Sequence, residues 1–167
     1  MSLGGHRRPA NWRSAWSKAP VSMAFATVGG VGHLPGGPGT YAAALMLAPI
    51  WWMKDLPLSM RLLALAVTLV LSVVCSDRAG RALGEHDSSQ IVIDEVVGVW
   101  VALVFFDELT WPMLLAGFVA FRILDMLKPP PAHWFDREVQ SGLGVVLDDV
   151  VAGLWALPLV WLVAILL

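Results

Sequence analysis

Long apolar stretches recur along the whole chain, and they constrain its fold more than any other feature. Five of them stand out, at roughly 42–53, 62–75, 96–106, 111–124 and 150–167. Their periodicity is helical, and the last approaches the ~20 residues that cross a hydrocarbon core. Charged residues make up only 14% of the chain, against roughly a quarter in soluble domains. We therefore predict an all-α, polytopic membrane bundle of about four to five apolar helices.

The shorter stretches span a bilayer only if flanking residues extend them or neighbouring helices shield them. A soluble all-helical bundle with very apolar helices is the alternative. Tryptophan favours the membrane, because indole rings anchor at the interface between lipid and water. Several of the nine tryptophans lie at or near the ends of apolar stretches: Trp51, Trp52, Trp111 and Trp161.

The distribution of lysine and arginine predicts an orientation, because short cytoplasmic loops retain these residues. If the N-terminus lies inside and each stretch crosses once, only Lys54 and Arg61 lie outside. The cytoplasmic side then receives nine: Arg7, Arg8, Arg13, Lys18, Arg78, Arg81, Arg122, Lys128 and Arg137. The loops at 29–41, 77–95 and 128–149 would all face the cytoplasm, so we expect a cytoplasm-facing site in the inner membrane.

Composition also bounds the organisation and the partners of the chain. Residues 1–20 form a basic N-terminal segment without the apolar core of a signal peptide, and residues 21–167 are expected to form one helical domain. A net charge of −2 without a basic run argues against nucleic acid as a partner. Cys75, the single cysteine, lies in an apolar stretch and is expected to serve packing.

A glycine-rich loop, GGVGHLPGGPGT, occupies residues 29–40. Six glycines and two prolines exclude a regular helix and expose backbone N–H groups, which can hold an anion ahead of a helix. The loop lacks the lysine of a Walker motif. The alternative is an ordinary turn in which Thr40 caps the next helix.

Two pairs of adjacent acids lie at the expected starts of apolar helices. Asp94 and Glu95 follow HDSSQIVI, and Asp148 and Asp149 open the last stretch. Negative charge in a first helical turn has a structural explanation, the helix dipole. Acids at the edge of a membrane helix are nevertheless costly unless they pair, bind a cation or line a polar cavity, so we expect a functional role. Gly98 would allow a neighbouring helix to approach closely.

A third motif, FRILDMLKPPP, places Arg122, Asp125 and Lys128 at i, i+3 and i+6, on roughly one helical face that the prolines terminate. A local ion pair is one interpretation. The other is a site in which Asp125 faces a cation while Arg122 and Lys128 meet phosphate oxygens.

Electrostatics connects these motifs. Two like charges about 4 Å apart repel by roughly 4 kcal/mol at an effective dielectric constant near 20, so the carboxylates cannot converge unpaired. Without further cysteines, and with histidines too scattered for zinc, the residue types suit a hard, oxygen-seeking ion such as Mg²⁺. His33, His86 and His133 are possible accessory groups, whereas His6 is not expected to take part.

In this order and combination the motifs resemble the phosphatidylglycerophosphatase A family, over residues 22 to 160. The matching positions are Gly39, Thr40, His86, Asp87, Asp94, Glu95, Gly98, Arg122, Asp125, Lys128, Pro129, Asp148, Asp149 and Gly153. The sequence departs from the family pattern at Tyr41–Ala43 and at Ser141. The resemblance implies a Mg²⁺-dependent enzyme that hydrolyses phosphatidylglycerophosphate to phosphatidylglycerol in the bacterial cytoplasmic membrane.

From the residue types we form a hypothesis about the roles. Mg²⁺ would be held by Asp94, Glu95, Asp125, Asp148 and Asp149, with Gly39, Thr40, Arg122 and Lys128 on the substrate. Among the catalytic residues, Asp94 and Glu95 act through the metal, and either His86 or Asp87 transfers protons. A covalent aspartyl-phosphate route stays open. Two other classes remain alternatives: a non-catalytic membrane ion carrier, and a CDP-alcohol phosphotransferase-like enzyme, whose long aspartate series the sequence lacks.

Overall fold

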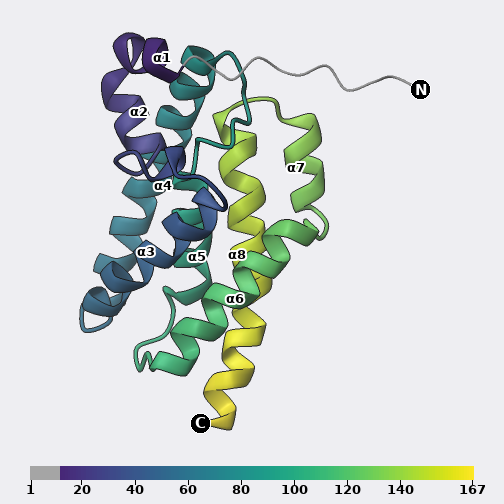
Figure 1. The fold of residues 1–167 in the computed structure, drawn as a ribbon. Coiled ribbons are helices and arrows are strands. Elements are labelled where there is room, and N and C mark those ends of the chain that lie inside the picture. The colour runs from purple at the N-terminus through teal and green to yellow at the C-terminus, as the bar shows by residue number, and fades with distance from the viewer. Residues whose placement is uncertain (1–11) are drawn as a thin grey trace.

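The computed structural model describes residues 12–167, and this part of the chain is helical and without strands. Figure 1 shows the order of its elements. The elements are α1 (Trp12–Lys18), α2 (Pro20–Ala26), the 3₁₀ turn η1 (Val31–His33), α3 (Pro38–Met53), α4 (Leu58–Leu83), α5 (Ile93–Leu103), α6 (Trp111–Leu127), α7 (Ala132–Glu138) and α8 (Gly142–Leu166). The all-α prediction is therefore confirmed. Residues 1–11 of the predicted basic segment, His6 among them, lie outside the described residues.

Proline and glycine set several of the helix boundaries. Pro20, Pro38 and Pro112 lie in the first turns of α2, α3 and α6, where the missing N–H of proline has no intrahelical partner to lose. Gly84 ends α4 with φ +80°, and its N–H donates to the carbonyl of Gly80 at 2.8 Å. This is the left-handed cap that glycine adopts without steric strain.

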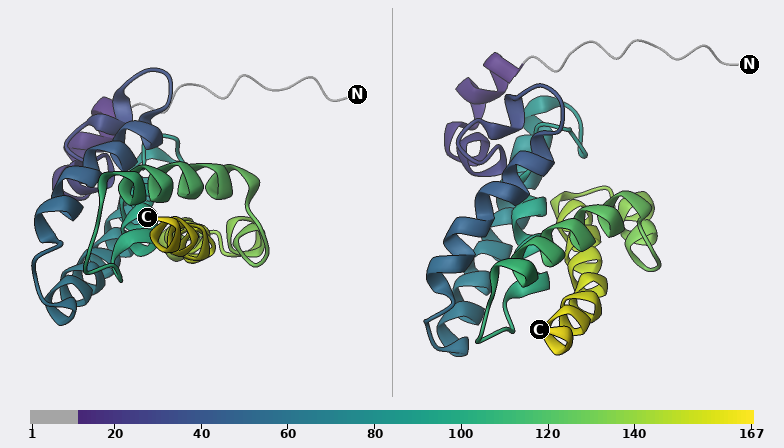
Figure 2. Two further views of the ribbon diagram at one scale, coloured as in Figure 1. Left: turned by 90° about the horizontal axis from the view of Figure 1, so that it is seen from below. Right: turned by 60° about the horizontal axis from the view of Figure 1, so that its bottom comes forward.

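Helix α5 forms the centre of the bundle. Every residue in it is buried except Glu95, which is half-buried. Helices α3, α4, α6 and α8 pack around it, and the views along and across the bundle show them surrounding it (Figure 2). Because the start of α5 carries Asp94 and Glu95, the packing of α5 determines where these two acids lie.

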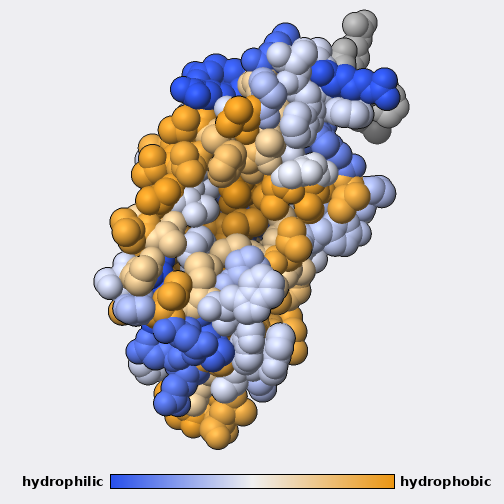
Figure 3. All heavy atoms as spheres, turned by 90° about the vertical axis from the view of Figure 1, so that its left-hand side faces the viewer, coloured by the Kyte–Doolittle hydropathy of each residue, from blue (hydrophilic) through white to orange (hydrophobic). Residues whose placement is uncertain are grey.

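Two helices, α4 with 26 residues and α8 with 25, are long and apolar enough to cross a membrane. Only 22% and 28% of their most apolar windows are buried, so neither is an enclosed core helix. Figure 3 shows apolar side chains over the middle of one face and polar side chains toward its two ends. Such a band is typical of a surface that meets lipid.

The prediction of four to five spanning helices is therefore too high for the described residues. Helices α3 and α6 have 16 and 17 residues, and α5 has 11. A helix of 11 residues reaches only about 16 Å at 1.5 Å per residue. Helix α5 is apolar because it is enclosed by other helices, which is the reason that hydropathy alone overstated the number of spans.

Arg61 has a different role from the exposed loop charge that the sequence predicts. It lies in the first turn of α4, is 3% exposed, and donates to the carbonyls of Val104 (3.0 Å) and Phe106 (2.7 Å) while it pairs with Asp107. The guanidinium thus satisfies carbonyl groups at the end of α5, which have no intrahelical donor. Cys75, in contrast, is buried in the same helix as predicted.

Candidate active site

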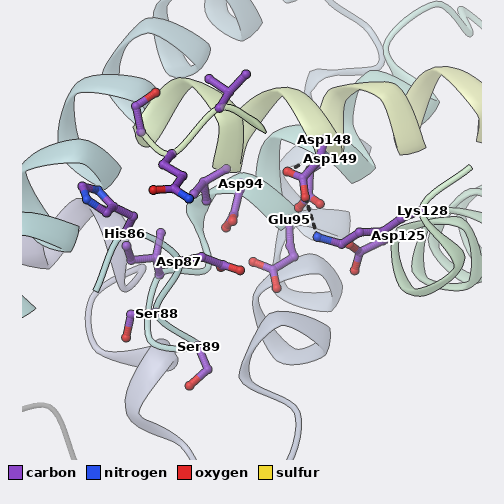
Figure 4. Close-up of a pocket in the computed structure, with 15 residues that line it drawn as sticks. His86, Asp87, Ser88, Ser89, Asp94, Glu95, Asp125, Lys128, Asp148 and Asp149 are labelled. Atoms are coloured by element: carbon purple, nitrogen blue, oxygen red, sulfur yellow. Dashed lines mark hydrogen bonds and ion pairs between the residues drawn. The ribbon is translucent and has the colours of Figure 1, made fainter. Parts of the chain in front are cut away.

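An acidic cavity of about 220 Å³ lies where the loop before α5 meets α6 and α8. Figure 4 shows its walls, with carboxylates from the loop, α5, α6 and α8 turned toward a common space. The eight predicted site residues that line it are His86, Asp87, Asp94, Glu95, Asp125, Lys128, Asp148 and Asp149. Residues that are far apart in the sequence therefore form one site.

Two glycines allow α5 and α8 to approach closely enough to form this site. A methyl group at Gly98 would overlap the Phe121 ring and meet the Asp149 carbonyl, and one at Gly153 would overlap the Gly98 carbonyl. The close approach predicted for Gly98 is thus confirmed. It brings the start of α5, with Asp94, beside the middle of α8.

Asp148 and Asp149 do not open the last helix, because α8 begins at Gly142. They lie almost two turns inside it and are 6% and 3% exposed. A helix dipole acts mainly within the first turn, so it does not explain two buried acids at this depth. The structural explanation that the sequence allowed for this pair is therefore excluded.

Three of the acids form a group that could hold a metal ion. Asp94, Glu95 and Asp149 each offer a carboxylate oxygen, and these oxygens lie within 4.8 Å of one another. Each side chain also has a buried oxygen without a hydrogen-bond partner in the described chain: Asp94 Oδ1, Glu95 Oε2 and Asp149 Oδ2. Buried acceptors are normally satisfied. A cation among these oxygens would satisfy all three.

The pKa values of the two α5 acids respond to this environment. Burial raises the pKa of Asp94 well above its ordinary value, and the neighbouring Glu95 raises it further. Burial also raises the pKa of Glu95, although contacts with Asp94 and Arg122 oppose the shift. A divalent cation would favour the ionised forms of both side chains.

The other two predicted metal ligands are paired with basic side chains instead. Lys128 Nζ lies 2.7 Å from Asp148 Oδ2, and Arg122 lies 2.7 Å from Asp125 Oδ2. Arg122 also lies 3.8 Å from Glu95 Oε1. The local ion pair that the sequence allowed between Arg122 and Asp125 is therefore present. Of the five predicted ligands, three form the candidate metal group, and the remaining two lie at its edge.

Three predicted substrate-binding residues do not line the cavity. Arg122 is partly buried behind Asp125 and Glu95. Gly39 lies in the first turn of α3, where a side chain would overlap the Glu95 carboxylate. Thr40 follows it and is half-buried, and it does not cap α3, because the N-cap residue is Gly37. The glycine-rich loop thus adjoins the acids through Gly39.

The candidate proton-transfer residues differ in direction. Asp87 points toward Glu95, whereas the His86 ring is turned away from the acids (Figure 4). His133 lies exposed on α7 and does not line the cavity. Polar residues that sequence reasoning missed also line it: Ser88, Ser89 and Gln140. Position next to the HD pair was the only sequence signal for the two serines.

Comparison with known proteins adds an independent observation. A family model described as phosphatidylglycerophosphatase A matches residues 24–164. A phosphatidylglycerophosphatase A of Escherichia coli (strain K12) is 40% identical over 125 residues, which cover 74% of this chain and 72% of that protein. One of Haemophilus influenzae (strain ATCC 51907 / DSM 11121 / KW20 / Rd) is 32% identical over 133 residues, covering 79% and 82%. No solved structure matches the chain.

Proposed function

The chain belongs to the phosphatidylglycerophosphatase A family, and from this premise we propose how it works: three carboxylates hold Mg²⁺ while the enzyme removes the terminal phosphate of phosphatidylglycerophosphate. The phosphatase activity, in phospholipid biosynthesis, follows from the family and from the names of the relatives. The metal and the residue roles are the proposal.

The observation that carries the proposal is the group of Asp94, Glu95 and Asp149, with three buried oxygens that lack a donor. The donor set consists of carboxylates, which suit Mg²⁺ better than a thiolate-seeking or imidazole-seeking ion. When bound, Mg²⁺ would neutralise the charge of the phosphate group and favour in-line attack by water. The residues present therefore fit the ion.

The chain's own residues supply the remaining tasks. Lys128, which reaches into the cavity from the end of α6, would contact a phosphate oxygen as a point charge. Asp87 would transfer the proton of the attacking water, and its direction toward Glu95 favours it over His86. Arg122 would hold Asp125 and Glu95 in place from behind the cavity.

We also propose that the protein is a multi-pass protein of the bacterial cytoplasmic membrane with the acidic cavity on the cytoplasmic side. The two long apolar helices and the family support a membrane location. The turn after α3 and the C-terminus lie at one end of the bundle, and α1 and the start of α8 lie toward the other (Figure 1). Lys and Arg are richer in loops of the latter end, which favours the cytoplasm there.

Phosphate release by the purified full chain in mixed micelles tests the function. We expect release from phosphatidylglycerophosphate that stops in EDTA, returns with Mg²⁺ and needs no nucleotide. A requirement for a nucleotide-activated lipid would favour the phosphotransferase alternative. Cation binding without any phosphate release would favour the ion carrier.

A further inference from the structure

A second hollow, of about 350 Å³, adjoins the acidic cavity. It lies between α1, the glycine-rich loop and the loop before α5, and Ser89 lines both spaces. In Figure 4, Ser88 and Ser89 lie on the side of their loop that is remote from Asp148 and Asp149. A ligand with its phosphate in the acidic cavity could therefore extend past Ser89 into the second hollow.

His33 provides a neutral hydrogen-bond donor in this hollow. The Trp16 indole N–H donates to His33 Nε2 at 2.9 Å, and a ring nitrogen that accepts a hydrogen bond carries no proton. The proton of the neutral imidazole is then on Nδ1. Burial lowers the pKa of His33, and the Gln90 side chain opposes the shift only in part, so the ring stays neutral at pH 7.

Gln90 provides a neutral acceptor. Its Oε1 is buried and has no hydrogen-bond partner in the described chain. The backbone around it is fixed, because Gly32 packs directly against the Gln90 carbonyl and the Val92 N–H donates to the Ala26 carbonyl at 2.8 Å. A buried acceptor without a donor is unfavourable by about 1–3 kcal/mol unless a ligand or water supplies the hydrogen bond.

The chemistry of the walls indicates the kind of group that fits. Trp12 lines the hollow, with its ring centroid 5.1 Å from that of His33. The described residues that line the hollow include no Asp, Glu, Lys or Arg. An aromatic face together with neutral donors and acceptors suits hydroxyl-bearing carbon atoms and not a phosphate or a cation.

We propose that this hollow binds the hydroxylated glycerol unit of the lipid headgroup, next to the phosphate in the acidic cavity. The inference rests on the proposed function, in which the substrate carries its terminal phosphate on such a glycerol. Its consequence is selectivity. A lipid whose phosphomonoester is attached directly to diacylglycerol, such as phosphatidic acid, leaves the hollow empty and the His33 and Gln90 groups unused.

The test compares the hydrolysis of phosphatidylglycerophosphate and phosphatidic acid by the purified full chain in mixed micelles. The variants are His33→Ala, Gln90→Leu and His33→Asn, whose amide N–H replaces the donor at Nδ1. Trp52→Ala is the control, because Trp52 is 76% exposed and far along α3 from the hollow. Thermal unfolding in detergent shows whether each variant is folded.

We expect His33→Ala and Gln90→Leu to lower kcat/KM about tenfold for phosphatidylglycerophosphate and to leave phosphatidic acid hydrolysis within about twofold. We also expect His33→Asn to recover part of the loss, and Trp52→Ala to change neither rate. Equal losses on both lipids, or no loss on either, would overturn the inference while the proposed function stands. A wild-type chain that releases no phosphate from phosphatidylglycerophosphate would overturn both.

Discussion

At the scale of single residues, the acids of the cavity fall into two groups. Asp94, Glu95 and Asp149 have buried oxygens without donors, whereas Asp125 and Asp148 are paired with Arg122 and Lys128. Replacing an acid of the first group by its amide removes a charge that repels its neighbours. The same change in a paired acid would leave a basic side chain without its partner.

Amide substitutions in the unpaired group should separate activity from stability. We expect Asp94→Asn and Asp149→Asn each to lower kcat/KM for phosphatidylglycerophosphate by at least about 100-fold, because a ligand of the metal is lost. The melting temperature should not fall, since like-charge repulsion is relieved. The measurements are phosphate release and thermal unfolding in detergent.

Asp55→Asn is the matched control, because the Asp55 side chain is 79% exposed and pairs only with its neighbour Lys54 in the described chain. It should keep normal activity. Near-normal rates in both cavity variants would remove the metal assignment from these residues.

Much of this site could be predicted from the sequence, and its pairing could not. Charge and apolar context pointed to all five acids, because charges beside membrane helices need a partner. Which acid meets which base depends on the side-chain positions that α6 and α8 impose together. Arg122 was assigned to phosphate from its residue type, although its contacts are with Asp125 and Glu95.

At the scale of helices, the contact between α5 and α8 controls the site. We expect Gly98→Ala to lower kcat/KM at least tenfold and to reduce stability by about 1–3 kcal/mol. The new methyl group would force Phe121 and α8 away and separate Asp94 from Asp149. Phosphate release and unfolding in detergent measure the two effects.

Gly84→Ala serves as the control for backbone strain. Gly84 has φ +80°, but a methyl group there meets nothing within 4 Å. It should therefore lower stability by about 1 kcal/mol and leave kcat/KM unchanged. If both variants lose stability and neither loses activity, the close approach of α5 and α8 does not position the acids.

Helix positions were easier to predict than helix lengths. The stretches at 42–53 and 111–124 lie within α3 and α6, but 62–75 is only the middle of α4, and α8 begins before 150. Polar residues continue both helices. Asp77 pairs with Arg81 one turn later in α4, an arrangement that favours a helix where hydropathy predicts a loop.

At the scale of the whole molecule, the polar loops at the α1 end should face one compartment. We expect single cysteines at Ser89 and Ser141, with Cys75→Ala, to resist an impermeant thiol reagent in intact spheroplasts and to react in inside-out vesicles. Ser88 is unsuitable because it is 3% exposed, whereas Ser89 and Ser59 are exposed.

A cysteine at Ser59, at the opposite end of α4, should show the reverse pattern. Labelling of positions 89 and 141 from outside would invert the proposed topology. Labelling of all three positions in both preparations would favour a soluble bundle that binds the membrane peripherally.

The central claim is that three carboxylates hold a divalent cation for lipid phosphate hydrolysis. Titration of the purified chain with Mn²⁺, followed by electron paramagnetic resonance, tests it most directly, because Mn²⁺ shares the preference of Mg²⁺ for oxygen ligands. We predict saturable binding that Mg²⁺ displaces and that an Asp94→Asn/Asp149→Asn double variant loses while it remains folded. Unchanged Mn²⁺ binding in that variant, or full phosphate release by a metal-free enzyme in EDTA, would contradict the claim.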